Sequence, residues 1–299
     1  MPFTFLCSSW GRMKTWMCAL GMCLTLITAT GAGGQGMDDV LKTLDETGTV
    51  ELHDTGVILS RANFVLGADS VEAIAFHPSA AGAYPGILII PGFSRTARDY
   101  VPFGVRFAAQ GFSCLVVTMP GFGRSSGSPD FCGPKTTAAL EAALRRFRTE
   151  GYVDSTRVGV YGYSRGAISA ATLATRNNGL RAGILASGIY DLARAYGEIK
   201  DQGILLNLKN ETGLTEAALR ERSPLFAMEH LACPVLILHG EKDQNAPVEQ
   251  AKLLEARLTE LKKPFEIKLY SEAGHDLGMA NVLEATGDFF ARTLKAKSK

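Results

Sequence analysis

Short apolar runs alternate with longer helical patterns along most of this chain. Several of the short runs are apolar almost throughout, which is typical of strands that are covered on both faces in a parallel sheet. The expected strands are residues 71–76, 86–90, 113–118, 157–161, 182–186, 235–239 and 265–270. The expected helices are residues 100–110, 135–150, 167–176, 248–262 and 277–295. This alternation predicts an α/β fold: a doubly wound, mostly parallel sheet flanked by helices.

One interval breaks the alternation. Residues 189–232 contain no expected strand, only helix-compatible sequence interrupted by glycines and a proline. Such an insertion could form a small helical cap over the C-terminal edge of the sheet, where folds of this class bind ligands. A longer crossover without contact to a ligand explains the same sequence equally well. We place an N-terminal extension and the first strands at residues 33–70, and the main domain at residues 71–299.

The N-terminus has a different pattern. Arg12 and Lys14 precede an uncharged apolar run over residues 15–30, and small residues follow it. A basic flank, a short apolar core and a small-residue exit predict a secretory signal peptide over residues 1–32, and hence a periplasmic or secreted protein. An uncleaved anchor fits less well, because the run falls short of the ~20 strongly apolar residues that span a bilayer. After cleavage we expect no stable association with a membrane.

Composition adds limits to this picture. The 299 residues are 46% hydrophobic and 20% charged, which allows one large core. Basic and acidic residues number 31 and 30 with no basic face, so a nucleic-acid partner has no electrostatic support. No cluster of cysteine and histidine suggests a metal. Cys114, Cys132 and Cys233 follow the signal segment; an oxidising compartment would permit one disulfide among them, although apolar surroundings favour buried thiols for Cys114 and Cys233. The oligomeric state stays open.

The pattern Gly-x-Ser-x-Gly occurs twice. It is typical of a nucleophile elbow, a strained strand-to-helix turn in which the flanking glycines avoid clashes and the serine is exposed above the sheet. Residues 123–127 form one match, but further loop sequence follows it, so we interpret it as a flexible turn. Residues 162–166 form the other match, with a strand before it and a helix after it. Ser164 is therefore the predicted nucleophile, and Gly162 and Gly166 are the elbow glycines.

A serine nucleophile needs a general base, and the base needs an orienting acid. In this fold class the order along the chain is serine, acid, histidine, and His275 follows the last expected strand. Asp243, beyond strand 235–239, is the predicted acid. Glu241 competes for this role from the same loop but is interpreted as a solvated carboxylate. Asp276 adjoins the histidine and is poorly placed to reach its ring.

Catalysis at a carbonyl also needs donors for the developing oxyanion, commonly worth ~3–4 kcal/mol each. The backbone N–H of Arg165, the residue after the nucleophile, is the first expected donor. The loop after strand 86–90 should supply the second. Phe93 is the expected donor there, and Gly92 allows the close approach of the backbone.

From about residue 71 to the C-terminus, the chain resembles α/β-hydrolases of the dienelactone-hydrolase and prolyl-oligopeptidase-like group. The segments that carry the resemblance are residues 91–93, 121–127, 151–154, 157–160, 162–166, 223–224, 239–243 and 273–275. The resemblance implies the α/β-hydrolase fold, no cofactor, and hydrolysis of esters, lactones, acyl groups or peptides.

Two departures from that group narrow the expected substrate. The chain has no room for the propeller of prolyl oligopeptidases, and Ser164 replaces the cysteine nucleophile of dienelactone hydrolases. Both favour a small-molecule substrate, a carboxylic ester with a small or medium acyl group. A peptidase for short peptides is the alternative; it would need a charged group, such as Arg124, Arg165 or an acid within 189–232, each interpreted as an ordinary surface charge. A non-catalytic binding protein is a third alternative, but it predicts loss of a triad residue, and all three are present.

Overall fold

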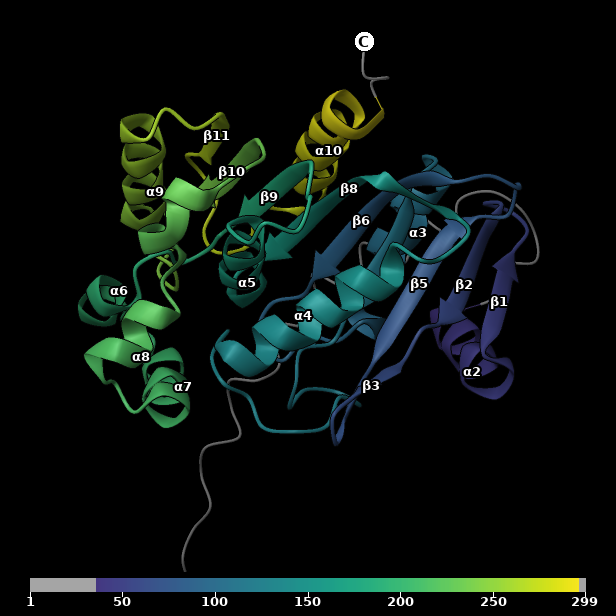
Figure 1. The fold of residues 1–299 in the computed structure, drawn as a ribbon, viewed down its shortest axis with the longest axis horizontal. Helices are drawn as coiled ribbons and strands as arrows, with labels where there is room; N and C mark the ends of the chain where they lie inside the picture. Colours follow the sequence, from purple (N-terminus) through teal and green to yellow (C-terminus); the bar gives the residue numbers. More distant parts are fainter. Residues whose placement is uncertain (1–35, 296–299) are drawn as a thin grey trace, which may run out of the picture.

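The computed structural model describes residues 36–295, so the predicted signal peptide lies outside the described residues. Within that range, nine strands form one sheet in the order β1-β2-β5-β7-β6-β8-β9-β10-β11 (Figure 1). The sheet is antiparallel from β1 to β7 and parallel from β7 to β11. The predicted doubly wound, mostly parallel sheet is therefore confirmed.

The strands of this sheet are β1 (Thr49–Leu52), β2 (Val57–Arg61), β5 (Ala73–Pro78), β6 (Tyr84–Ile90), β7 (Ser113–Val117), β8 (Val153–Tyr163), β9 (Ala182–Ala186), β10 (Val235–Gly240) and β11 (Phe265–Tyr270). A separate hairpin comprises β3 (Phe64–Leu66) and β4 (Asp69–Val71). The helices that flank the sheet are α2 (Met37–Thr47), α3 (Val101–Ala109), α4 (Pro134–Phe147), α5 (Arg165–Ala174), α9 (Glu249–Glu260) and α10 (Met279–Phe290).

Side chains that alternate along each central strand build two cores. In β6, Leu88 and Ile90 pack with residues of α4, α5 and α9, whereas Ile87 and Ile89 pack on the opposite face with α2, α3 and α10. All four side chains are fully buried, and each such burial stabilises the fold by roughly 1.5–3 kcal/mol. Because helices cover both faces, these strands are apolar at every position rather than at every second one.

The elements at the two ends of the chain differ from expectation. The structure adds α2 and the hairpin β3–β4, and it splits the expected strand 71–76 at Glu72. The N–H of Glu72 donates to Ser125 Oγ (2.9 Å) and its carbonyl accepts from the N–H of Thr118 (2.9 Å), so its backbone leaves the strand pattern. The expected final helix, 277–295, ends at Phe290 and continues as a π-helical turn, η3 (Ala291–Lys295).

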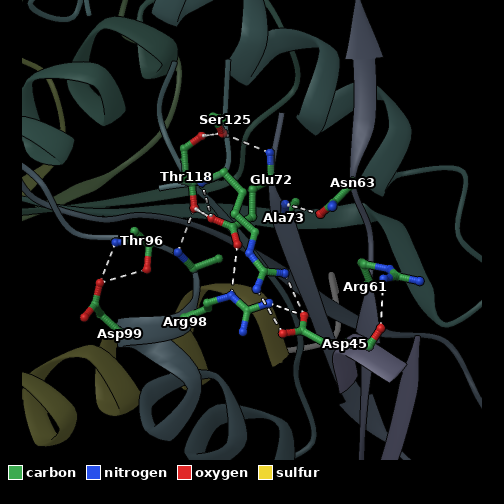
Figure 2. Close-up of polar contacts among 12 residues, drawn as sticks. Asp45, Arg61, Asn63, Glu72, Ala73, Thr96, Arg98, Asp99, Thr118 and Ser125 are labelled. Carbon is green, nitrogen blue, oxygen red and sulfur yellow. Dashed lines mark hydrogen bonds and ion pairs between the residues drawn. The ribbon is translucent and has the colours of Figure 1, made fainter. Parts of the chain in front are cut away.

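A network of charges attaches α2 to the rest of the domain (Figure 2). Asp45 on α2 pairs with Arg98, in the 3-10 turn η1 (Arg98–Tyr100), and with both terminal nitrogens of Arg124 (2.7 and 3.0 Å). Arg98 Nε also donates to Glu72 Oε1 (3.2 Å), and Thr118 Oγ1 donates to Glu72 Oε2 (2.9 Å). Glu72 is only 3% exposed, so its charge depends on these partners.

The Gly-x-Ser-x-Gly match at residues 123–127, outside the elbow, lies in the same network. Residues 123–127 form a loop that no helix follows, as expected. The loop is packed rather than flexible, because Ser125 is buried and its hydroxyl donates to the Thr118 carbonyl (2.8 Å) while accepting from Glu72 (Figure 2). Ser125 therefore has a structural role.

The insertion at residues 189–232 folds into α6 (Leu192–Glu198), α7 (Gln202–Thr212), α8 (Glu216–Glu221) and the 3-10 turn η2 (Pro224–His230). The three α-helices gather at one end of the molecule (Figure 1). Each has an N-cap residue whose side-chain oxygen accepts a hydrogen bond from a backbone N–H of the first turn, and such a cap is typically worth ~1 kcal/mol. The N-cap residues are Asp191, Asp201 and Thr215. Among the elements of residues 36–295, no helix combines the length and hydropathy that crossing a bilayer requires.

We predict that Asp45→Asn lowers the free energy of unfolding by about 1–2 kcal/mol at pH 7. The guanidinium groups of Arg124 and Arg98 lower the pKa of Asp45 from 3.8 to about 2. A lowered folded-state pKa stabilises the fold above the unfolded value and loses this effect as the pH falls. The difference between the two proteins should therefore narrow from pH 4 toward pH 2, as measured by urea unfolding at several pH values.

The matched control is Asp54→Asn, at an exposed turn position. An equal loss of stability in both variants at pH 7 would contradict the role given to Asp45.

Candidate active site

Ser164 lies in a sharp turn between β8 and α5, with φ 56° and ψ −121°. Such a conformation costs a non-glycine residue of order 1–3 kcal/mol and is typical of functional sites. A Cβ added at Gly162 would lie 2.2 Å from the carbonyl oxygen of Gly166, and one at Gly166 would lie 2.1 Å from that of Ile90. Only glycine fits at either position, which explains the spacing of the motif.

The structure brings the three predicted triad residues together. His275 Nε2 lies 2.8 Å from Ser164 Oγ, and His275 Nδ1 lies 2.8 Å from Asp243 Oδ2. They come from the loops that follow β8, β10 and β11, at the carboxyl ends of strands in the parallel part of the sheet. This geometry suits proton transfer from the serine to the imidazole. Their roles in catalysis stay predictions.

The Asp243 side chain is fully buried, and backbone groups stabilise its charge. Its Oδ1 accepts the N–H groups of Asn245 (2.9 Å) and Ala246 (2.8 Å), which leaves Oδ2 for the histidine. The other carboxylates lie elsewhere: Glu241 is exposed, and Asp276 Oδ1 accepts the N–H of Gly278 (2.9 Å). Among these three acids, only Asp243 orients the imidazole.

Two residues that the sequence analysis missed hold the backbone of His275. The hydroxyls of Tyr163 and Ser187 both donate to its carbonyl oxygen, each at 3.0 Å. Burial raises the pKa of Tyr163 well above its ordinary range, so the phenol keeps the proton it donates. Both residues lie at the carboxyl ends of parallel strands, β8 and β9, and that position was the signal that could have identified them.

A second histidine supports the acid loop. His239 is fully buried on β10; its Nε2 lies 2.7 Å from the Ala246 carbonyl and 3.5 Å from Asp243 Oδ2. Burial lowers the pKa of His239, so the neutral ring donates its Nε2 proton to that carbonyl. His239 therefore fastens the loop that carries the acid.

The two expected oxyanion donors flank Ser164. Arg165 is the first residue of α5, and the loop of Phe93 packs so closely on the elbow that a Cβ at Gly92 would lie 3.4 Å from that of Ser164. Neither backbone N–H, of Phe93 or of Arg165, donates to another atom of residues 36–295. Both are therefore available to an oxyanion, which stays a prediction.

A pocket of about 50 Å³ opens beside Ser164. Its lining is mostly apolar, with contributions from the loops at the sheet edge and from the insertion 189–232. The lining residues are Phe93, Phe131, Ser164, Arg165, Ile168, Ser187, Ile189, Ile204, Asn207, Asn245, Ala246 and His275. The insertion thus contacts the pocket rather than passing it at a distance.

The interpretation of Arg165 as an ordinary surface charge is wrong. Its side chain is 6% exposed and pairs with Glu211 of α7 through three N–O contacts of 3.0–3.1 Å. The guanidinium lies 4.5 Å from the ring centroid of Phe93 and 4.2 Å from that of Phe131. The burial arises because the insertion covers the elbow. Arg124, by contrast, is half exposed and paired with Asp45.

The cysteines are buried, free thiols in the described part of the chain: Cys114, Cys132 and Cys233. Burial raises the pKa of Cys132 and of Cys233 to about 11, so both stay protonated near neutral pH. The Cys132 thiol donates to the Arg165 carbonyl (3.2 Å). Residues 36–295 contain no group of three or more His, Cys, Asp or Glu side chains arranged to hold a metal ion.

Comparison with known proteins places this geometry in a family. The profile of the prolyl oligopeptidase family matches residues 133–297, which include the three triad residues, and that of the X-Pro dipeptidyl-peptidase (S15) family matches residues 55–206. Uncharacterized peptidase YtmA of Bacillus subtilis is 30% identical over 211 residues, 69% of this chain and 81% of that protein. Bis(hydroxyethyl) terephthalate hydrolase of Streptomyces coelicolor is 25% identical over 212 residues, 67% of this chain and 66% of that protein.

Solved structures share the fold at lower identity. Acetyl xylan esterase from Paenibacillus sp. R4 is 17% identical with a TM-score of 0.71, over 86% of this chain and 93% of that chain. Pyrococcus horikoshii acylaminoacyl peptidase is 18% identical with a TM-score of 0.71, over 89% of this chain but only 45% of its own. This chain thus spans less than half the length of that peptidase. It belongs to the prolyl oligopeptidase family and is a serine hydrolase with the α/β-hydrolase fold.

Proposed function

We propose that this serine hydrolase cleaves carboxylic esters with small or medium acyl groups through an acyl-Ser164 intermediate. Ser164 Oγ attacks the ester carbonyl while His275 Nε2 takes its proton, and Asp243 stabilises the resulting imidazolium. The oxyanion accepts hydrogen bonds from the N–H groups of Phe93 and Arg165. His275 then returns the proton to the leaving alcohol and activates the water that hydrolyses the acyl group.

The observation that carries the choice of ester over peptide is the charge of the pocket. Of the residues that line it, Arg165 is the one with a permanent charge, and Glu211 neutralises it. Binding the charged terminus of a short peptide there without a partner would cost several kcal/mol. A neutral ester requires no such partner, and the mostly apolar lining of the pocket suits an uncharged acyl group.

The names of similar proteins support both reaction classes. The Streptomyces relative is named for an ester substrate, and the Paenibacillus esterase, whose chain is covered to 93%, shares the fold. The family name and YtmA point to peptides. A peptidase for short peptides is therefore the second candidate. We favour the esterase because neither arginine considered for binding a peptide terminus is unpaired.

We expect the wild-type protein to hydrolyse p-nitrophenyl butyrate with a kcat/KM at least about 100-fold above that for alanyl-p-nitroanilide, because the ester is the more reactive acyl donor and the alanyl group brings an unpaired ammonium group. Ser164→Ala should lower kcat by about 1,000-fold or more and abolish labelling by a fluorophosphonate probe. A higher kcat/KM for the arylamide would favour the peptidase. Activity that survives Ser164→Ala would remove the proposed nucleophile.

The acid can be tested against its competitor in the same loop. Asp243→Asn should lower kcat by about 100- to 10,000-fold, because the imidazolium loses its stabilising charge and the productive tautomer is no longer enforced. Glu241→Gln, at an exposed position, is the matched control and should leave kcat within about twofold. Steady-state kinetics with p-nitrophenyl butyrate measure both; a larger effect at Glu241 would reverse the assignment.

We also propose that the protein is exported and loses residues 1–32. The basic flank at Arg12 and Lys14 and the apolar run that follows support this. The mass of the protein from periplasm or medium should correspond to a chain that begins at residue 33. A full-length chain that sediments with membranes would instead indicate an anchor.

A further inference from the structure

We propose that Glu211 of α7 is a specificity-determining positioning residue, which makes the enzyme select uncharged acyl groups over anionic ones. It acts through Arg165, whose charge it neutralises beside the nucleophile, and through Phe131, whose backbone it holds. This inference rests on the proposed esterase function and adds the charge of the substrate to it.

One face of α7 forms a wall of the pocket. Ile204 and Asn207 line the pocket. Asn207 follows Ile204 by three residues and Glu211 follows it by seven, so all three lie on the same face of the helix. Leu208, on the adjoining face, is fully buried in the core of the insertion. The helix is thus held between its own core and the elbow, and the position of its polar end is set by the contact with Arg165.

The pair of Glu211 and Arg165 is shielded from water. The two side chains are 11% and 6% exposed, and the guanidinium packs against the rings of Phe93 and Phe131. Electrostatic interactions in such surroundings are stronger than at a surface, and removing one partner leaves the other charge uncompensated. Because the guanidinium packs against both rings, we expect Arg165 to keep its position when the carboxylate is removed.

Glu211 also holds a strained segment of the pocket. Its Oε2 accepts the N–H of Phe131 at 2.7 Å. Phe131 and Cys132 have φ angles of 48° and 62°, two consecutive non-glycine residues in the left-handed region. The same carboxylate therefore fixes the Arg165 side chain and the backbone of an aromatic residue that lines the pocket.

These contacts determine how the site treats a charged substrate. An acyl group with a free carboxylate would meet an arginine whose charge is already satisfied and a second carboxylate that repels it. An uncharged acyl group needs no cationic partner and is not repelled by Glu211. Without the charge of Glu211, the same arginine becomes an unpaired cation next to Ser164 and would attract the anionic acyl group.

The test uses ethyl butyrate and ethyl hemisuccinate, whose four-carbon acyl groups end in a methyl group and in a carboxylate, and follows the release of acid. Alkyl esters are chosen because the free carboxylate of an activated aryl hemisuccinate would attack its own ester carbonyl. In the wild type, kcat/KM should be at least about tenfold higher for the butyrate ester. Glu211→Gln should raise the hemisuccinate-to-butyrate ratio by about tenfold, and added salt should reduce that gain. Glu211→Asp, which keeps the charge, should keep the wild-type preference for butyrate. A merely structural role would lower both activities without changing their ratio.

The matched control is Glu266→Gln, which removes the carboxylate of a bidentate pair with Arg292 on the exposed surface. Its ratio should equal that of the wild type. An unchanged ratio in Glu211→Gln, with butyrate still hydrolysed, would overturn the inference and leave the esterase intact. If Glu211→Gln does not fold, a wild type that accepts both esters equally would overturn it. A wild type that hydrolyses arylamides but neither ester would overturn the proposed function itself.

Discussion

The site depends on backbone segments that approach one another too closely for any side chain. Gly166 lies against the carbonyl of Ile90, so the elbow rests directly on the end of β6. The same constraint recurs at the other half of the site: a Cβ at Gly240 would lie 2.1 Å from the carbonyl of Gly274. That second contact joins the loop of Asp243 to the loop of His275. Two close contacts between main chains thus set the distances on which the triad geometry depends.

Buried hydrogen bonds further restrict the positions of Asp243 and His275. The aspartate shares its oxygens between backbone N–H groups and the imidazole, and the carbonyl of His275 accepts two hydroxyls. An ion pair between Glu211 and Arg165 attaches the insertion to the residue that follows the nucleophile. A buried polar group that loses its hydrogen-bond partner destabilises the fold. Each of these partners therefore restricts the movement of the group to which it is bonded. These contacts hold the segments around Ser164 in place.

Sequence patterns predicted the features that depend on neighbouring residues or on the order of elements along the chain. The strands at 182–186 and 265–270 match the structure to the residue, because turn residues bound each run. The structure also brings together the serine, acid and histidine that strand-end positions and chain order singled out. Contacts between distant segments were not accessible in this way. Glu72 interrupts a strand because its backbone bonds to Ser125, about fifty residues away. Arg165 is buried because α7, Phe93 and Phe131, from three separate segments, all pack against it.

The attachment of α2 has a consequence for how the chain can be shortened. Arg98 follows the loop that carries Phe93, and it is held by Asp45 and Glu72 together (Figure 2). Trimming the N-terminus past Asp45 would remove the carboxylate that Arg98 and Arg124 share, next to that loop. The N-terminal helix is therefore part of the catalytic unit rather than a spacer. A shortened chain that keeps these ion pairs should therefore begin no later than Met37, the first residue of α2.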